Sequence, residues 1–144
     1  MREALEGAAC GLAAERMSDE KLSELAVMLE RHADAIAKSG QYVQLSKDDD
    51  FHFLIVRESG NQRIFNALCS ELYVQIRLYR FRSSSMPGRS EMALKEHHDI
   101  VEAISSRDRR KAEEAMRTHI SNARKNLMWD ASIDVLPTRK GTRS

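Results

Sequence analysis

Residues that interrupt helices are scarce in this chain. Of its 144 residues only 6 are glycine and 2 are proline, whereas 42% are hydrophobic and 31% are charged. Because helix-favouring alanine, leucine, glutamate, lysine and arginine are abundant, the composition predicts long helices rather than strands. The length is that of one domain, so we do not expect a second hydrophobic core.

Further absences narrow the class of protein. No apolar run approaches the roughly 20 residues that span a bilayer. The net charge is only +1, so the bulk charge points to neither nucleic acid nor a membrane surface. The N-terminal segment is amphipathic and contains acidic residues, unlike a secretory signal. Cys10 and Cys69 have no paired spacing. We interpret them as reduced core residues of a cytoplasmic protein.

Capping and breaking residues divide the chain into helices. Ser18, Asn61 and Asp108 are suitable N-caps. Gly40 fits the position after a helix C-terminus, and Pro87 lies in the strongest break, SSSMPGRS. Apolar residues at helical spacing complete the pattern. The expected helices cover approximately residues 2–16, 19–39, 41–58, 62–84, 91–106 and 109–133.

Short turns between long amphipathic helices are typical of an antiparallel bundle. We therefore predict an all-α fold, an antiparallel bundle of about six helices. The folded domain is expected to cover residues 1–133, and the polar, basic residues 134–144 are expected to form a disordered tail.

Four residues of the types that bind transition metals lie in segments predicted to be helical. Asp48 and His52 are four residues apart, His97 lies in EHHDIVEAI, and His119 closes EEAMRTHI. One carboxylate and three imidazoles suit a divalent ion such as Zn²⁺, Ni²⁺ or Mn²⁺. If the helices bring these residues together, they form a metal centre with coordination positions left for another ligand.

Helical geometry predicts which of these residues lie at the same height along the bundle axis. Residues four apart lie on one helix face, so Asp48 and His52 would project together. A turn near Arg107 places His97 about 15 Å and His119 about 18 Å along two antiparallel helices. Both histidines lie on apolar faces, where their ring nitrogens need partners. One metal would satisfy both.

Spacing alone leaves a simpler interpretation open, in which the histidines are core residues satisfied by hydrogen bonds and the Asp-x-x-x-His pair arises by chance. The two other histidines fit the site less well. His32 lies among charged residues, and we expect it to be exposed. His98 points about 100° away from His97, so only one of the two can face the core squarely.

Several short motifs together resemble a known family. In chain order they are REALE (2–6), DDDFH (48–52), ESGN (58–61), EHHDIVEAI (96–104), DRRKA (108–112) and MRTH (116–119). Each motif is degenerate, but their order over residues 2 to about 128 resembles the ligand-binding C-terminal (FCD) domain of FadR-type regulators in the GntR family.

The resemblance implies an all-helical bundle that forms homodimers and senses a small organic acid. In metal-binding members the ligands come from the positions of Asp48, His52, His97 and His119, so one divalent transition metal is implied. We expect zinc, with nickel or manganese as alternatives. DNA binding would require the family's winged-helix domain, which we expect to be absent from this chain. No membrane partner is implied.

Arginines are the expected partners of an acid effector, because a guanidinium group binds carboxylates in a bidentate manner. Arg77 and Arg80 lie three residues apart and so near one another on one helix face. Arg2 could contribute from the first helix. The alternative for each is an exposed helix arginine without a ligand.

Two other interpretations of a metal site remain. A metal-dependent hydrolase would need a general base near an open coordination position. The nearest acids in sequence, Asp49, Asp50 and Glu96, are each turned at least about 100° from the neighbouring ligand. We therefore predict no catalytic residue and no enzyme. In the remaining interpretation the metal is purely structural and joins three helices.

Overall fold

The computed structural model describes residues 1–40 and 49–133, and every regular element within them is helical. This confirms the all-α class. The elements are α1 (Arg2–Arg16), α2 (Asp19–Ser39), α3 (Phe51–Glu58), α4 (Gln62–Asn66), the π-helical segment η2 (Ala67–Glu71), α5 (Tyr73–Ser84), α6 (Arg89–Ser105) and α7 (Arg109–Ile133). No helix in the described part of the chain is long and apolar enough to cross a membrane.

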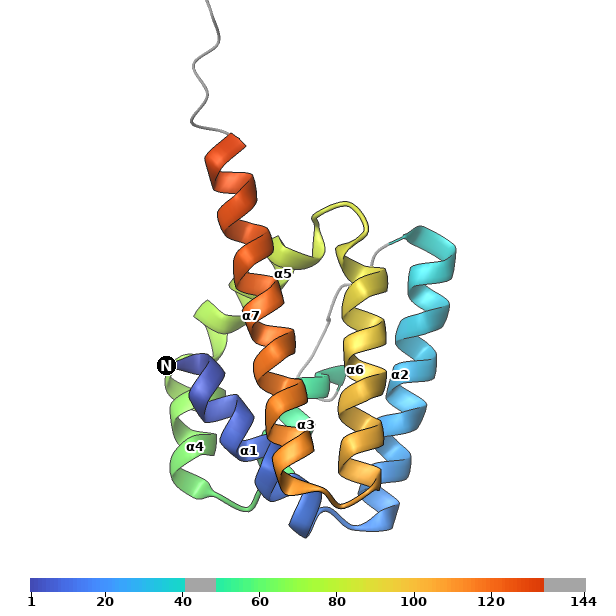
Figure 1. Ribbon diagram of the computed structural model, residues 1–144, viewed down its shortest axis with the longest axis vertical. Coiled ribbons are helices and arrows are strands. Elements are labelled where there is room, and N and C mark those ends of the chain that lie inside the picture. The colour runs from blue at the N-terminus through green and yellow to red at the C-terminus, as the bar shows by residue number, and fades with distance from the viewer. Residues whose placement is uncertain (41–48, 134–144) are drawn as a thin grey trace, which may run out of the picture.

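The long helices form an antiparallel bundle. Helices α2, α6 and α7 stand side by side, with α6 and α7 joined by a short turn at their lower ends (Figure 1). Helix α1 packs against α7 and α3. The paired α6 and α7 carry two of the predicted metal ligands, so this arrangement determines whether those ligands meet.

The predicted caps explain where several helices begin and end. The Ser18 side chain accepts a hydrogen bond from the Lys21 N–H (3.2 Å), and Asp108 Oδ1 accepts one from the Lys111 N–H (3.0 Å). Asn61 Oδ1 accepts from the N–H groups of residues 63 and 64. Gly40 has the left-handed φ of 71° that ends α2, a conformation that glycine adopts without steric cost.

The prediction of a helix from residue 41 to 58 is wrong at Asp50. The backbone of Asp50 is extended (φ −98°, ψ 108°), and its side chain caps α3 by accepting a hydrogen bond from the Phe53 N–H (3.1 Å). Helix α3 therefore begins at Phe51, and no continuous helix runs through Asp50 to His52. Asp48 itself lies outside the described residues.

The helix predicted for residues 62–84 contains a π-helical interruption. The Leu72 N–H donates to the Ala67 carbonyl, five residues earlier, at 3.2 Å. Leu72 then leaves helical geometry (φ −105°, ψ 4°), and α5 begins at Tyr73. A π turn holds more residues than an α turn, so it rotates the faces of α5 relative to α4.

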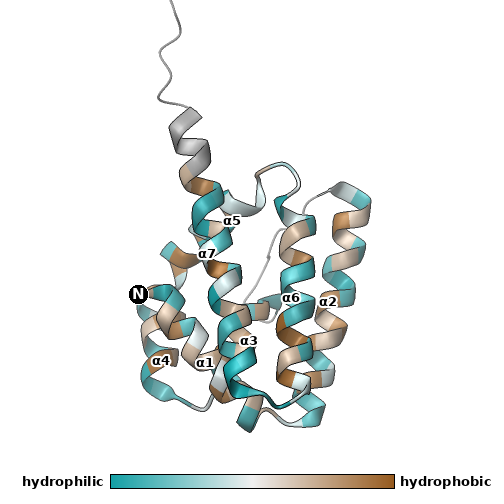
Figure 2. Cartoon of the chain, viewed as in Figure 1, coloured by the Kyte–Doolittle hydropathy of each residue, from teal (hydrophilic) through white to brown (hydrophobic). Residues whose placement is uncertain are grey.

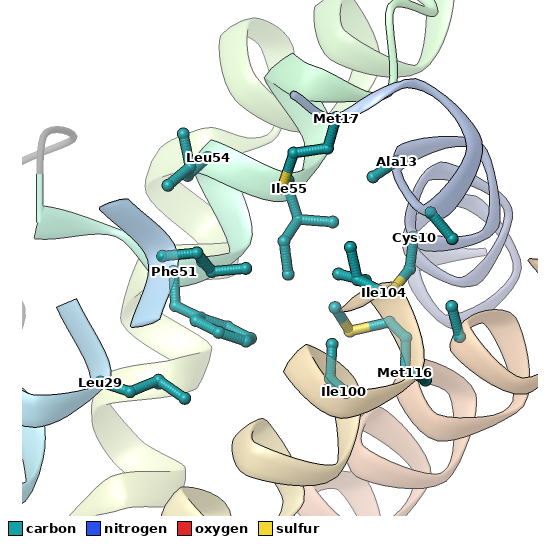
Figure 3. Close-up of a cluster of buried hydrophobic side chains, with 14 of the residues drawn as sticks. Cys10, Ala13, Met17, Leu29, Phe51, Leu54, Ile55, Ile100, Ile104 and Met116 are labelled. Carbon is teal, nitrogen blue, oxygen red and sulfur yellow. The ribbon is translucent and has the colours of Figure 1, made fainter. Parts of the chain in front are cut away.

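Two hydrophobic clusters meet at α1. Figure 2 shows apolar and polar residues alternating along the long helices, as amphipathic packing requires. The larger cluster joins α1, α2, α3, α6 and α7; it includes Cys10, Ile55, Ile104 and Met116, whose side chains converge in Figure 3. The smaller cluster includes Cys69 of η2. Both cysteines are buried and unlinked, which confirms their prediction as core residues.

Candidate metal centre

Three histidines from three helices converge in the bundle. His52 lies in the first turn of α3, His97 in the middle of α6 and His119 in the middle of α7. The Nε2 atom of His119 is 3.2 Å from Nε2 of His52 and 3.1 Å from Nε2 of His97. One ring nitrogen from each residue lies within 4.8 Å of the other two. The predicted meeting of His97 and His119 on antiparallel helices is confirmed.

Two carboxylates, the buried Glu6 and the partly buried Glu96, orient two of the imidazoles. Glu6 Oε1 is 2.7 Å from Nδ1 of His52, and Glu96 Oε2 is 2.5 Å from Nδ1 of His119. An ionised carboxylate only accepts hydrogen bonds, so each Nδ1 carries the proton and donates it. In the neutral rings, both Nε2 atoms then present lone pairs. The same arrangement of carboxylate, histidine and metal recurs at zinc sites.

The neutral state of the rings follows from their surroundings. Burial, followed by the charge of Arg80, lowers the pKa of His52 to about 3. Burial and then the neighbouring His119 lower the pKa of His97 well below its ordinary value. Burial also lowers the pKa of His119, although Glu96 opposes that effect. Neutral imidazole is the form that binds a metal.

This donor set fits a transition metal. The lone pairs of His52 and His119 face each other across 3.2 Å without a proton between them in the neutral state, an unfavourable contact that a cation would relieve. An ion about 2.0–2.1 Å from each nitrogen holds its ligands about 3.3 Å apart in a tetrahedral site and about 3.0 Å apart in an octahedral one. The observed 3.1 and 3.2 Å separations lie within this range.

Glu6 connects the histidines to α5. Its side chain is 1% exposed and pairs with Arg2, with Arg80 Nη2 (3.0 Å) and with His52. Burial alone would raise the pKa of Glu6, but the charges of the two arginines outweigh it and hold that pKa well below its ordinary range. Glu6 is therefore an ionised acceptor for the His52 ring.

Glu96 forms the equivalent network around His119. Its carboxylate accepts hydrogen bonds from both terminal nitrogens of Arg89 (3.1 and 2.7 Å) and from Asn122 Nδ2 (2.8 Å). Burial raises the pKa of Glu96, but the hydrogen bonds from His119 and Arg89 prevail and lower it to about 2. Residues of α6 and α7 together thus fix one imidazole.

We expect Glu96→Gln to weaken zinc binding by about 10- to 100-fold, because the ring of His119 loses its charged acceptor. Competition with a chromophoric chelator would measure the change. Glu91→Gln is the matched control, since Glu91 is an exposed acid on the same helix. Equal zinc affinity in both variants would show that Glu96 does not support the ligand.

Sequence reasoning missed the contacts of both carboxylates with the histidines, although a signal was present. Glu6 lies on the core face of α1, four residues before the buried Cys10, and Glu96 lies four residues before the buried Ile100. An acid at a core position of an amphipathic helix needs a buried partner. Position in the sequence relates an acid only to the histidine next to it, whereas Glu6 and Glu96 contact histidines on other helices.

Comparison with known proteins agrees with this architecture. Residues 1–122 match the family model of the FCD domain. The chain belongs to the FCD domain family. The relatives include two proteins described as the HTH-type transcriptional repressor NanR. The one from Cronobacter sakazakii (strain ATCC BAA-894) is 27% identical over 136 residues, covering 89% of this chain and 48% of the relative. The one from Salmonella newport (strain SL254) is 28% identical over 127 residues, covering 83% and 45%.

The chain thus spans about half the length of the curated relatives that it matches. The match confirms the resemblance to effector domains of GntR-type regulators, and the choice of His97 over His98 agrees with the structure. His97 joins the cluster, whereas His98 is exposed. Phe51 stacks on His97 with ring centroids 4.2 Å apart, which fixes the orientation of the third imidazole of the FCD domain.

A cavity of about 460 Å³ opens above the histidines of this FCD domain. Arg2, Arg77 and Arg80, the three predicted effector residues, all line it together with the three histidines. Arg80 is already engaged, because its Nη1 lies 3.0 Å from both Asp50 oxygens and its Nη2 contacts Glu6. Arg2 also lies over the Tyr79 ring, 5.4 Å from its centroid.

The prediction that His32 is exposed is wrong. His32 is 3% exposed, lines the same cavity and has its Nε2 3.4 Å from Asp49 Oδ1. The charges around it in sequence lie on other faces of α2. Met28 and Ile36, four residues before and after it, are both buried, so the apolar stripe of α2 includes position 32.

Proposed function

We propose that this FCD domain is the metal-containing effector sensor of a GntR-type transcription regulator. In this proposal Asp48, His52, His97 and His119 hold one divalent ion, with zinc expected first and nickel or manganese as alternatives. The observation that carries the proposal is the 3.2 Å separation of the Nε2 atoms of His52 and His119, with each ring fixed by a carboxylate at its Nδ1.

A small organic acid is the proposed effector. A bound cation would supply positive charge and open coordination positions at the base of the cavity. Arg2 and Arg77 line the same cavity and are the proposed partners of the acid, since guanidinium groups bind carboxylates well. Because Arg80 is held by Asp50 and Glu6, we propose that it positions these carboxylates and, through Glu6, the His52 ring.

The proposed output is a change in a homodimer whose DNA contacts are made through a winged-helix domain outside this sequence, in the cytoplasm. A ligand can shift such an equilibrium only by binding two arrangements with different affinity. Helix α5 forms one wall of the cavity and is joined to α1 and α3 through Arg80. We therefore propose that ligand binding changes the homodimer through a movement of α5.

The alternative of a metal-dependent hydrolase has less support. The three acids considered as general bases all have partners: Asp49 pairs with Arg31 and His32, Asp50 with Arg80, and Glu96 with Arg89 and His119. A base held in this way is poorly placed to accept a proton from water. Sensing fits the family and the site better.

Calorimetry tests the proposal directly. Zinc-loaded and chelator-stripped protein would be titrated with a panel of mono-, hydroxy- and dicarboxylates, while circular dichroism monitors the fold. We expect at least one acid to bind the loaded protein about tenfold or more tighter than the stripped protein, and the stripped protein to remain helical.

Two outcomes would contradict the sensor proposal. If no acid binds either form, the cavity is not an acid site. If the stripped protein unfolds and acids bind the loaded form without preference, the metal is structural, because its binding free energy then appears as folding free energy.

A further inference from the structure

Beyond the histidines, five helices contribute apolar side chains to the walls of the cavity. Ile36 of α2, Phe51 of α3, Leu78 of α5, Leu94 of α6 and Ala123 of α7 all line it. The charged and titratable groups near the histidines are arginines and His32, and the other polar lining residues are serines and tyrosines. Such a division fits a ligand that has one charged end and an apolar body.

Helix α5 contributes an unusual strip to this wall. Val74, Leu78 and Phe81 recur at helical spacing, line the cavity and remain 66%, 60% and 50% exposed. Large apolar side chains left in water at one cavity mouth mark a surface that gains stability when covered. The strip is continuous with the histidine cavity, so a ligand bound at the histidines would extend along it.

Polar side chains of the walls are largely committed within the protein. Arg80 is held by Asp50 and Glu6, and Arg89 by Glu96. The Ser84 hydroxyl donates to the Phe81 carbonyl (2.9 Å), and the Ser90 hydroxyl donates to the Ser84 carbonyl (3.2 Å). A polyhydroxylated ligand would bury hydroxyl groups against walls with few partners for them, which opposes binding.

Two buried donors of the cavity remain for an acid. Arg2 Nη1 and Arg80 Nε are buried and have no hydrogen-bond partner among the described residues. Arg2 lines the cavity with the three histidines, so an anion bound there would supply the missing acceptor. The buried donors of the cavity that lack a partner thus belong to arginines that line it together with the histidines.

We propose that the effector is an amphipathic monocarboxylate, with its acid group at the histidines and Arg2 and an aliphatic or aromatic body along Val74, Leu78 and Phe81. This rests on the proposed function and adds a prediction that it does not contain: linear fatty acids of medium length bind, and sugar acids of similar size do not compete with them.

The test is a calorimetric series of butanoate, hexanoate and octanoate on the full-length chain loaded with zinc, with gluconate and 1-octanol as comparison probes. Each buried methylene contributes about a fourfold gain in affinity, so octanoate should bind about 200-fold tighter than butanoate. Gluconate should bind more weakly than octanoate by about 100-fold or more, and 1-octanol should bind more weakly because it lacks the acid.

Matched valine variants locate the apolar body. Val74→Asn should weaken octanoate at least about fivefold, whereas Val27→Asn should leave it unchanged. Val27 is also an exposed valine (54%), on α2 and away from this cavity. Zinc content, measured alongside, should be the same in both variants.

The possible failures are distinguishable. Affinity that does not rise with chain length, gluconate binding as tight as octanoate, or equal effects of the two valine variants would each overturn the amphipathic ligand while leaving an acid sensor intact. Octanoate and 1-octanol binding equally, with or without zinc, would instead overturn the acid anchor on which the proposed function depends.

Discussion

Replacing His119 with alanine is expected to abolish tight zinc binding, with a loss of affinity well above 100-fold. His119 is the central member of the histidine cluster, since its Nε2 atom lies 3.2 and 3.1 Å from those of the other two histidines. Loss of a residue that merely orients a ligand costs about 10- to 100-fold, so loss of the ligand itself should cost more. Elemental analysis and chelator competition would measure it.

The matched control for this variant is His98→Ala. His98 is exposed, whereas its neighbour His97 belongs to the cluster, so zinc affinity should not change. Circular dichroism should show both variants folded, because Glu96 retains Arg89 and Asn122 when His119 is removed. Unchanged zinc content in His119→Ala would remove the metal centre from the proposal.

The second large effect concerns stability without metal. We expect Glu6→Gln to destabilise the chelator-stripped domain by about 3 kcal/mol, because breaking a buried ion pair leaves an uncompensated charge. Glu6 is 1% exposed and pairs with Arg2 and Arg80. Urea unfolding followed by circular dichroism would give the change in free energy of unfolding.

Glu3→Gln provides the comparison on the same helix. Glu3 pairs with Arg124 on the surface, where the two side chains are 29% and 53% exposed, so its loss should cost less than about 1 kcal/mol. Similar free energies of unfolding for the two variants would show that the network around Glu6 does not stabilise the fold.

The sequence was sufficient to predict the ends of those helices that begin or end at a capping residue. Ser18, Gly40, Asn61 and Asp108 behave as predicted because a cap acts on backbone groups within a few residues. That His97 and His119 lie at the same height on adjacent helices was also predictable, since it depends only on the helix rise per residue and a short turn. Both predictions depend on residues close together in the sequence.

Features that depend on distant partners were harder to predict. Asp50 caps the start of α3 and is also bound to Arg80, 30 residues away. The burial of His32 depends on packing of α2 against α6, and the roles of Glu6 and Glu96 depend on histidines from other helices. The predicted ligand Asp48 and the predicted tail at 134–144 lie outside the described residues and stay predictions.

The π-helical segment has a consequence for how relatives are aligned. Removing one residue between Ala67 and Glu71 would restore an ordinary helix and turn α5 by about 100°. Arg80 would then leave Asp50 and Glu6, even with every side chain of the site conserved. Between Asn61 and Arg80 the number of residues is therefore as informative as their identity. A relative with one residue fewer there must present another side chain to Glu6.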